Sequence, residues 1–215
     1  MTDLLLPGFD EAEDQQRLSH LDRIVADSSD RMAWLRARSR GITATDVAKL
    51  STPRSVESAA REKWFGSRFS GNAYTEHGRD REPAIAQWVA DHHGIAPSSL
   101  LFHSELDKRH LATPDGLSVT DAGTVVLAEI KTTNKPWRSI PRHYLRQIWW
   151  QQYVVGAERT LFVWERHEEF VPVGEPECCW VERDEDAIAT LVSLATQLIA
   201  TIDGFARRHA GALGV

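Results

Sequence analysis

An apolar run that carries two charged side chains constrains this chain more than any other feature. The segment 124–133 is rich in β-branched residues and follows an Asp-Ala-Gly turn sequence that begins at Asp121, which predicts a strand entered from a turn. Because side chains alternate along a strand, Glu129 and Lys131 point to one face and Ile130 to the other. The flanking residues are almost all apolar, which is typical of a strand covered on both faces. Burying a charged side chain there costs several kcal/mol unless it is paired or bound to a metal ion. The pair therefore indicates a functional site more than a surface ion pair.

A second acid precedes this strand. Asp115 follows Pro114, and it joins Glu129 and Lys131 if residues 110–113 form the neighbouring strand of a hairpin. The sequence therefore predicts two carboxylates and one ammonium on a single surface of a sheet.

A third acid comes from a predicted helix that begins at Asp80, has Pro83 in its first turn and ends at Gly94. Glu82 shares one helix face with the apolar Ile85 and Val89, so we expect it to face the sheet. Three clustered carboxylates repel one another and a phosphate unless divalent cations neutralise them. An all-oxygen cluster suits Mg²⁺ or Mn²⁺.

Composition indicates a single soluble domain. The chain has 215 residues, 42% hydrophobic and 26% charged, which is enough for a sizeable core. Residues 1–16 contain five acids and no Lys or Arg, so we expect a solvated acidic arm there and one domain over 17–215. The net charge of −6 means that any DNA contact has to come from a local patch.

Cysteine usage favours an intracellular chain. Cys178 and Cys179 are adjacent, so they suit neither a structural disulfide nor a four-cysteine cluster. No apolar run reaches about 18 residues, and the first residues lack the positive charge of a signal peptide. We therefore expect a cytoplasmic location and no membrane partner.

An arginine-rich junction offers a candidate anion site. The pattern over 17–40 predicts a helix, with Ser29 or Asp30 as a cap, that ends before Gly41, and a short second helix follows through Leu50. Three arginines at 36, 38 and 40 lie beside the start of that second helix, where free N–H groups attract anions. Taken by itself, the pattern favours an ordinary capped helix with solvated arginines over an anion site.

The other elements complete an α/β pattern. Helices are expected over 55–65, over 141–155 and from Asp184 onward, with strands over 160–165, 168–173 and 178–182. The loop 67–74 between two helices has the composition of a ligand-contacting segment. Gln147 is polar on a core-facing helix stripe, so it is either a hydrogen-bonded core amide or a site residue.

The order and spacing of these pieces resemble a known family. Pro114-Asp115 followed by Glu129-Ile130-Lys131 resembles the PD-(D/E)xK nuclease signature. The wider pattern from Trp34 to Asp184 is similar to the lambda exonuclease and YqaJ-type viral recombinase branch of that superfamily. The matching positions are Trp34, Arg38, Ile42 to Thr45, Gly78, Glu82, Thr113 to Leu117, Glu129 to Lys131, Tyr144 to Gln147 and Val181 to Asp184.

The resemblance implies a fold and a set of residue roles. The fold would be α/β with a restriction-endonuclease-like core, in which helices flank a central mixed β-sheet. Two Mg²⁺ ions, or Mn²⁺ in their place, would be held by Glu82, Asp115, Glu129 and the carbonyl group of Ile130. Lys131 and Gln147 would position the attacking water, and a second set of residues would bind a 5′ phosphate of the DNA: Arg38, Thr45 and Thr113. Thr45 stands where the family has a serine, and Trp149 stands where a second glutamine often follows Gln147.

The resemblance also implies an activity. The chain would be a metal-dependent 5′ to 3′ exodeoxyribonuclease that acts on ends of linear double-stranded DNA and leaves 3′ single strands for phage-type homologous recombination. A single-strand annealing protein and a closed homo-oligomer, a trimer for example, are the expected partners. The alternatives are another PD-(D/E)xK nuclease, either an endonuclease or a repair exonuclease, and a catalytically inactive DNA-end-binding protein.

Overall fold

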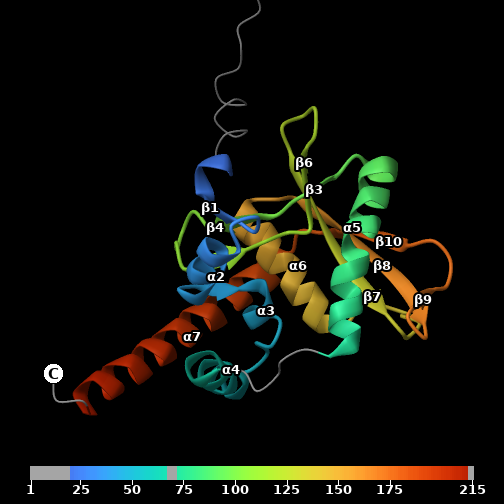
Figure 1. The fold of residues 1–215 in the computed structure, drawn as a ribbon. Coiled ribbons are helices and arrows are strands. Elements are labelled where there is room, and N and C mark those ends of the chain that lie inside the picture. Colours follow the sequence, from blue (N-terminus) through green and yellow to red (C-terminus); the bar gives the residue numbers. More distant parts are fainter. Residues whose placement is uncertain (1–19, 67–71, 213–215) are drawn as a thin grey trace, which may run out of the picture.

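The structure, a computed structural model, describes residues 20–66 and 72–212 and contains two sheets with helices around them (Figure 1). The expected acidic arm over 1–16 lies outside the described residues. Most of the loop predicted over 67–74 also lies outside them, since residues 67–71 are not described.

The larger sheet is the central mixed sheet that the sequence predicted. Its strand order is β10 (Glu177–Glu182), β8 (Arg159–Glu168), β7 (Val125–Thr133), β6 (Gly116–Val119) and β3 (Ala96–Pro97), and β9 (Val171–Pro172) pairs with β8. β7 runs parallel to β8, and the other pairs are antiparallel. The smaller sheet, with the order β1 (Ile24–Asp27), β4 (Leu100–His103), β5 (His110–Ala112) and β2 (Ile42–Thr43), was not predicted.

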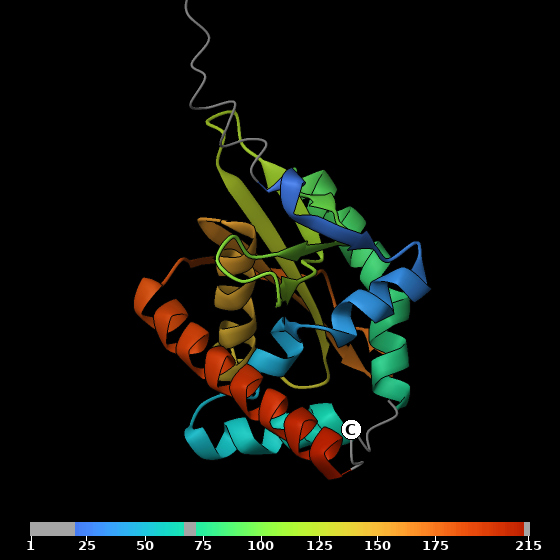
Figure 2. The same cartoon turned by 90° about the vertical axis from the view of Figure 1, so that its left-hand side faces the viewer.

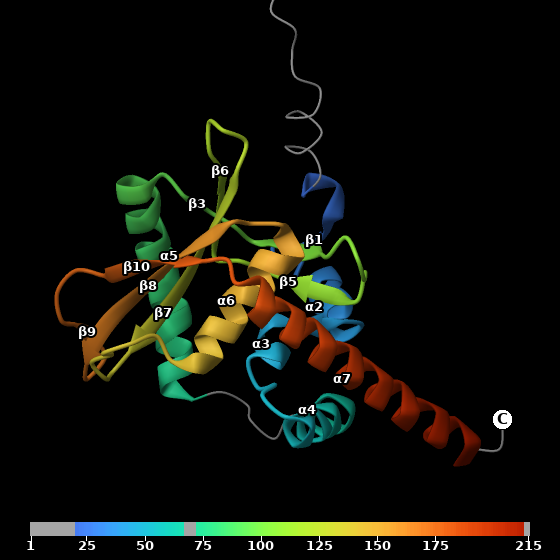
Figure 3. The ribbon, with the colours of Figure 1, turned by 180° about the vertical axis from the view of Figure 1, so that it is seen from behind.

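Helices cover both faces of the larger sheet. Ile85 and Val89 of α5 (Ala73–His93) pack on Val126 and Ile130 of β7. On the opposite face, α6 (Arg142–Val155) lies between the sheet and the long α7 (Glu185–Ala212), as Figure 3 shows from behind. Side chains of β7 therefore alternate between a face under α5 and a face under α6.

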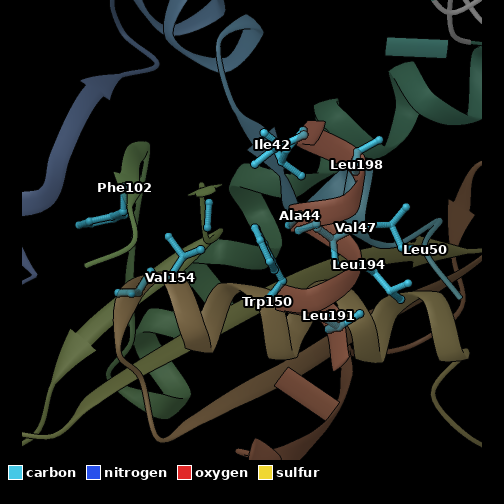
Figure 4. Close-up of a cluster of buried hydrophobic side chains, with 14 of the residues drawn as sticks. Ile42, Ala44, Val47, Leu50, Phe102, Trp150, Val154, Leu191, Leu194 and Leu198 are labelled. Carbon is cyan, nitrogen blue, oxygen red and sulfur yellow. The ribbon is translucent and has the colours of Figure 1, made fainter. Parts of the chain in front are cut away.

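The main core is built around α6. Trp150 is fully buried against leucines of α7, and residues beside α3 (Ala44–Val47) close the cluster (Figure 4). The indole Nε1 of Trp150 donates to the Leu111 carbonyl oxygen at 3.0 Å, which satisfies its buried N–H. Burying each such large apolar side chain contributes about 1.5–3 kcal/mol.

The last helix also packs on α4 (Pro53–Phe65), and the two cross in Figure 2. By length and composition alone, Glu185–Ala210 of α7 could span a membrane. Its apolar stripe, however, is the one that packs in the core, with Leu191, Leu194 and Leu198 buried.

Two predicted helices have different starts. In the described part of the range 17–40, α2 (Arg31–Ser39) is the α-helix, and Asp30 caps its start by accepting the N–H of Ala33 at 3.0 Å. Residues 24–27 instead form β1, which pairs with β4, while 21–23 form the short 3-10 helix η1 (Leu21–Arg23). α5 begins at Ala73 rather than near Asp80, since Asn72 caps it through the N–H of Thr75.

The partner of the central strand also differs from the prediction. Residues 110–112 form β5 in the smaller sheet, and β6 is the strand that pairs with β7. Asp115 lies in the link between these two sheets, immediately before β6. The hairpin prediction was therefore wrong about the strand, although it placed Asp115 beside the correct neighbour.

Candidate active site

The site lies where β7 extends past the end of its neighbour. β6 pairs with β7 only as far as Gly116 opposite Ala128, so the edge of β7 from Glu129 onward has no partner strand on that side. Asp115 fills the first position, since its Oδ2 accepts the N–H of Ile130 at 2.7 Å. This bond satisfies an edge N–H and fixes the carboxylate beside Glu129.

Glu129 is buried, with 1% of its surface exposed, and it has two charged or polar partners. Lys131 Nζ donates to Glu129 Oε1 and, at 3.0 Å, to the carbonyl oxygen of Ile130. Gln151 Nε2 of α6 donates to Glu129 Oε2 at 2.7 Å. Both carboxylate oxygens are therefore held, and the alternation predicted for β7 is confirmed.

Glu82 reaches the same group of charges from α5. Partial burial raises the pKa of its carboxyl; Lys131 opposes the rise and the carboxylate of Glu129 adds to it. These mutual effects put the predicted acids within electrostatic reach of one another. Among the described residues, no hydrogen bond or ion pair fixes the Glu82 side chain itself.

Burial and the repulsion of like charges together raise the pKa values of two site acids, Glu82 and Asp115. Burial raises the pKa of Asp115 well above its ordinary range, and the carboxylates of Glu129 and Glu82 raise it further. Burial alone would lower the pKa of Lys131, but Glu129 and Asp115 more than offset that effect and raise it. The lysine is thus held as a cation, and the carboxylates still lack charge compensation.

The chemistry of the candidate ligand atoms suits a hard divalent cation. All of its members are oxygens, and the crowding that raises the pKa of Asp115 is what such an ion would relieve. Within the described ranges, no three Asp, Glu, His or Cys side chains are grouped around a common point for an ion. One cation, the ammonium of Lys131, already bridges Glu129 and the Ile130 carbonyl, so an ion at those oxygens would require Lys131 to move.

Gln151 is a site residue that the sequence reasoning did not select. It lies one helical turn after Gln147 on α6, is buried, and has an Oε1 without a partner among the described residues. Gln147 is half-buried, and no contact of its side chain with Glu129 or Lys131 is seen. The available signal was the four-residue spacing of the two glutamines, which puts both on one face of the helix.

The predicted phosphate-binding residues lie at a second place. Arg38 of α2 is half-buried, its guanidinium carbon lies 4.3 Å from the centre of the Trp34 ring, and burial lowers its pKa. Thr45 and Thr113 follow the parallel strands β2 and β5 at corresponding positions, since Thr43 pairs with Leu111. Thr45 is exposed on α3, and the buried Oγ1 of Thr113 has no partner among the described residues. α3 has only four residues, so its dipole adds little, and its Asp46 carboxylate lies within electrostatic reach of the Arg38 guanidinium.

A cluster of two histidines, a glutamate and an arginine lies beside the last residues of β7, where Thr132 pairs with Glu165. Arg81 of α5 forms a fork onto Glu165 of β8, with N–O distances of 3.0 and 2.8 Å. His167 Nε2 lies 2.6 Å from Glu165, and His77 Nε2 lies 2.7 Å from His167 Nδ1. This Arg81–Glu165–His167–His77 array joins the first half of α5 to β8 on the N-terminal side of Glu82.

Solved structures with this arrangement define the class of fold. An alkaline exonuclease from Laribacter hongkongensis superposes with a TM-score of 0.66 at 22% identity, covering 85% of this chain and 100% of that one. The same enzyme in complex with dAMP gives 0.65. A phage-related exonuclease from Haemophilus somnus gives 0.61 at 11% identity, over 79% of this chain and 96% of that one. This protein therefore has the nuclease fold of phage-type exonucleases.

The family follows from the sequence itself. The model of the YqaJ-like viral recombinase domain matches residues 33–158, which include Arg38, Glu82, Asp115, Glu129 and Lys131. The chain belongs to the YqaJ-like viral recombinase family. Among curated proteins, none matches it in sequence.

Proposed function

We propose that this protein is a metal-dependent exodeoxyribonuclease that degrades linear double-stranded DNA from the 5′ end. The observation that carries the proposal is the group formed by Asp115, Glu129 and Lys131 at the unpaired edge of β7, in a chain of the YqaJ-like family. An inactive end-binding protein would have no need to hold charged groups in this costly arrangement.

Each site residue has a role in this proposal. Glu82, Asp115, Glu129 and the Ile130 carbonyl would hold two Mg²⁺ ions, for which Mn²⁺ would substitute. When bound, the ions supply a water of lowered pKa and neutralise charge on the phosphate. Lys131 and Gln147 position the attacking water, and Gln151 holds Glu129 in place through its 2.7 Å hydrogen bond.

The proposed polarity rests on the Arg38 region. A guanidinium can fork onto two oxygens of a terminal phosphate, and Thr45 and Thr113 add hydroxyl donors. The buried hydroxyl of Thr113, unpartnered among the described residues, supports a ligand at this place. The dAMP bound by the Laribacter enzyme is a mononucleotide of the kind that such a reaction releases.

The product and partners follow from the polarity. Removing nucleotides from a 5′ end leaves a 3′ single strand, which a single-strand annealing protein would take up for recombination in the cytoplasm of a bacterial cell. We also propose a closed homo-oligomer, with a trimer as the first candidate, because an acidic chain has little basic surface with which to hold a duplex by itself.

The test uses purified protein with Mg²⁺ and two DNA substrates, one linear duplex and one covalently closed circle of the same sequence. We expect mononucleotides from the linear DNA and an intact circle, and no reaction in EDTA. Cleavage of the circle would instead support an endonuclease of the same superfamily. Binding of ends without hydrolysis at any Mg²⁺ or Mn²⁺ concentration would support an inactive end-binding protein.

A further inference from the structure

A large cleft lies next to the candidate active site and has no role in the reaction described above. Its volume is about 900 Å³, within the range of ligand sites, and its walls come from α5, the end of β7, the start of α6 and the β8–β9 turn. These segments lie at the same end of the larger sheet in Figures 1 and 3. Tyr144 lines the cleft, and the Lys131 ammonium lies 5.5 Å from the centre of its ring. The cleft is therefore adjacent to the charged end of the candidate active site.

Aromatic rings form the outer walls of this cleft. Tyr74 and Phe170 are 58% and 42% exposed, and their ring centres are 5.0 Å apart. His77 meets Phe170 edge-on at 5.2 Å, and Trp137 lies across the cleft beside Tyr144. Exposed rings gathered in one concave surface offer flat faces to a planar ligand.

The walls are held in place by the rest of the fold. His77 is fixed by the Arg81–Glu165–His167–His77 array, through its 2.7 Å contact with His167. Glu169 and Phe170 have φ values of 48° and 67°, left-handed conformations that are strained for residues other than glycine. A two-residue hairpin loop favours positive φ at both positions, so the β8–β9 turn fixes the backbone of Phe170 beside the cleft at a cost in backbone energy.

The charged and polar residues of the cleft limit the kind of ligand that it can bind. Glu169 lines the cleft and repels a phosphate, and Glu168 does so in part, because Arg166 pairs with it at 3.1 Å. The Asn134 amide and the hydroxyl groups of Thr132 and Thr133 are neutral hydrogen-bonding groups. A ligand with a flat apolar face, polar edges and no charge satisfies both sets of residues. A nucleobase has these properties.

We propose that this cleft binds an unpaired nucleobase of the DNA strand that is being cut, by stacking on Phe170 and Tyr74. The inference rests on the proposed function, because it assumes that the DNA strand is bound and cut at the Asp115–Glu129–Lys131 site. The bases next to the reacting phosphate then lie in the aromatic cleft, while the backbone stays near Lys131 and away from Glu168 and Glu169.

The test measures binding, so that it does not depend on cleavage. The host is the Asp115→Asn chain with Mg²⁺ present, and the probe is a fluorescein-labelled duplex whose first four base pairs at the 5′ end are mismatched. The same probe is also made with one abasic residue at each of these four positions in turn. Phe170→Ala and Tyr74→Ala are compared with Phe65→Ala, a control that removes a ring that is 75% exposed on α4, outside the cleft.

We expect Phe170→Ala and Tyr74→Ala to raise the Kd for the intact probe by about five- to tenfold, and Phe65→Ala to leave it unchanged. One abasic position should weaken binding to the host by a similar factor, yet have no further effect on the Phe170→Ala chain, because protein and DNA changes then remove the same contact. Tyr74→Phe should bind like the host.

Independent effects of the protein and DNA changes would overturn the proposal, as would unchanged Kd values for both cleft variants at matched melting temperature. A failure of the proposed function is recognised separately, from the inability of the unmodified chain to digest linear DNA in Mg²⁺.

Discussion

Gln151 and Gln152 are adjacent buried amides with different partners. Gln151 Nε2 donates to the site carboxylate of Glu129, whereas Gln152 Nε2 donates to Thr160 Oγ1 at 3.1 Å and to the Val181 carbonyl at 2.9 Å. The first glutamine thus belongs to the site, and the second joins α6 to β8 and β10.

This difference predicts that one alanine variant lowers kcat and the other lowers stability. Gln151→Ala should lower kcat by about 10- to 100-fold, the usual cost of losing a group that orients a metal ligand. Gln152→Ala should lower the free energy of unfolding by about 1–3 kcal/mol, since it leaves buried polar groups unpaired, with kcat per folded molecule unchanged. Steady-state kinetics and urea unfolding on both variants separate these effects. Equal kcat values for Gln151→Ala and the unmodified chain would exclude the assigned role.

Arg38 provides a second test at this scale. On duplexes that differ only in a 5′ phosphate or 5′ hydroxyl, Arg38→Ala should slow the phosphorylated substrate much more, and so bring the two rates together. Arg38→Lys should restore part of the difference, because an ammonium cannot form the fork. Single-turnover rates with excess enzyme report this without product release. A full phosphate preference in Arg38→Ala would place the anchor elsewhere, with Arg36 and Arg40 the next candidates.

How much of the site could be predicted from sequence depends on the kind of contact. Glu129 and Lys131 share a face because strand geometry fixes alternation, and Glu82 follows from helix periodicity. Gln151 could not be separated from Gln147, since both lie on one helix face and only the packing of α6 on β7 decides which amide reaches Glu129. The cleft at Phe170 could not be predicted either, because it joins four elements distant in sequence.

Among the elements, α5 is joined to β8 by polar contacts of Arg81 with Glu165 and of His77 with His167. Pro83 lies inside this helix and provides no N–H for the usual bond to the preceding turn. Glu82 therefore lies within a weakened turn, and the ion pair of Arg81 with Glu165 anchors the helix beside it.

This connection predicts a pH-dependent loss of stability. Burial alone would raise the pKa of Glu165, but hydrogen bonds from Arg81 and His167 more than offset that effect and lower it. Because the pKa of Glu165 is lower in the folded chain than in the unfolded chain, the ionised carboxylate stabilises the fold. This stabilisation is fully present above the pKa of the unfolded chain, near 4.5, and is lost as the pH falls through the pKa of the folded chain. Glu165→Gln should therefore cost about 2 kcal/mol at pH 7.

Urea unfolding of both chains between pH 7 and pH 3 measures this. The difference between the unmodified chain and Glu165→Gln should shrink as the pH falls. A difference that stays constant over this range would show that the Glu165 charge has no part in holding α5.

Element boundaries show what local sequence leaves undecided. The helix over 142–155 matches its prediction closely, because its apolar stripe and Gly156 mark it clearly. Residues 24–27 follow a helical pattern, yet they form β1, since pairing with β4 outweighs local propensity. The early start of α5 was missed because a proline at 83 suggested a first turn, while the Asn72 cap lies in a segment that resembles a loop.

For the whole molecule, charge predicts assembly. With a net charge of −6, a lone chain has little attraction for a long duplex, so we propose that several copies enclose the DNA during digestion. We expect light scattering at micromolar concentration to give a closed oligomer, with three copies as the first candidate. A monomer that still digests DNA processively would remove the reason for a ring.

The most direct test of the account is the order in which label leaves a linear duplex. One strand is labelled at its 5′ end or its 3′ end, and release of mononucleotide is followed in Mg²⁺ for the unmodified chain and for Glu129→Gln. The account predicts that 5′ label leaves first, that none is released in EDTA, and that Glu129→Gln releases none although it remains folded. Earlier release of the 3′ label, or near-normal turnover by Glu129→Gln at the same melting temperature, would contradict it.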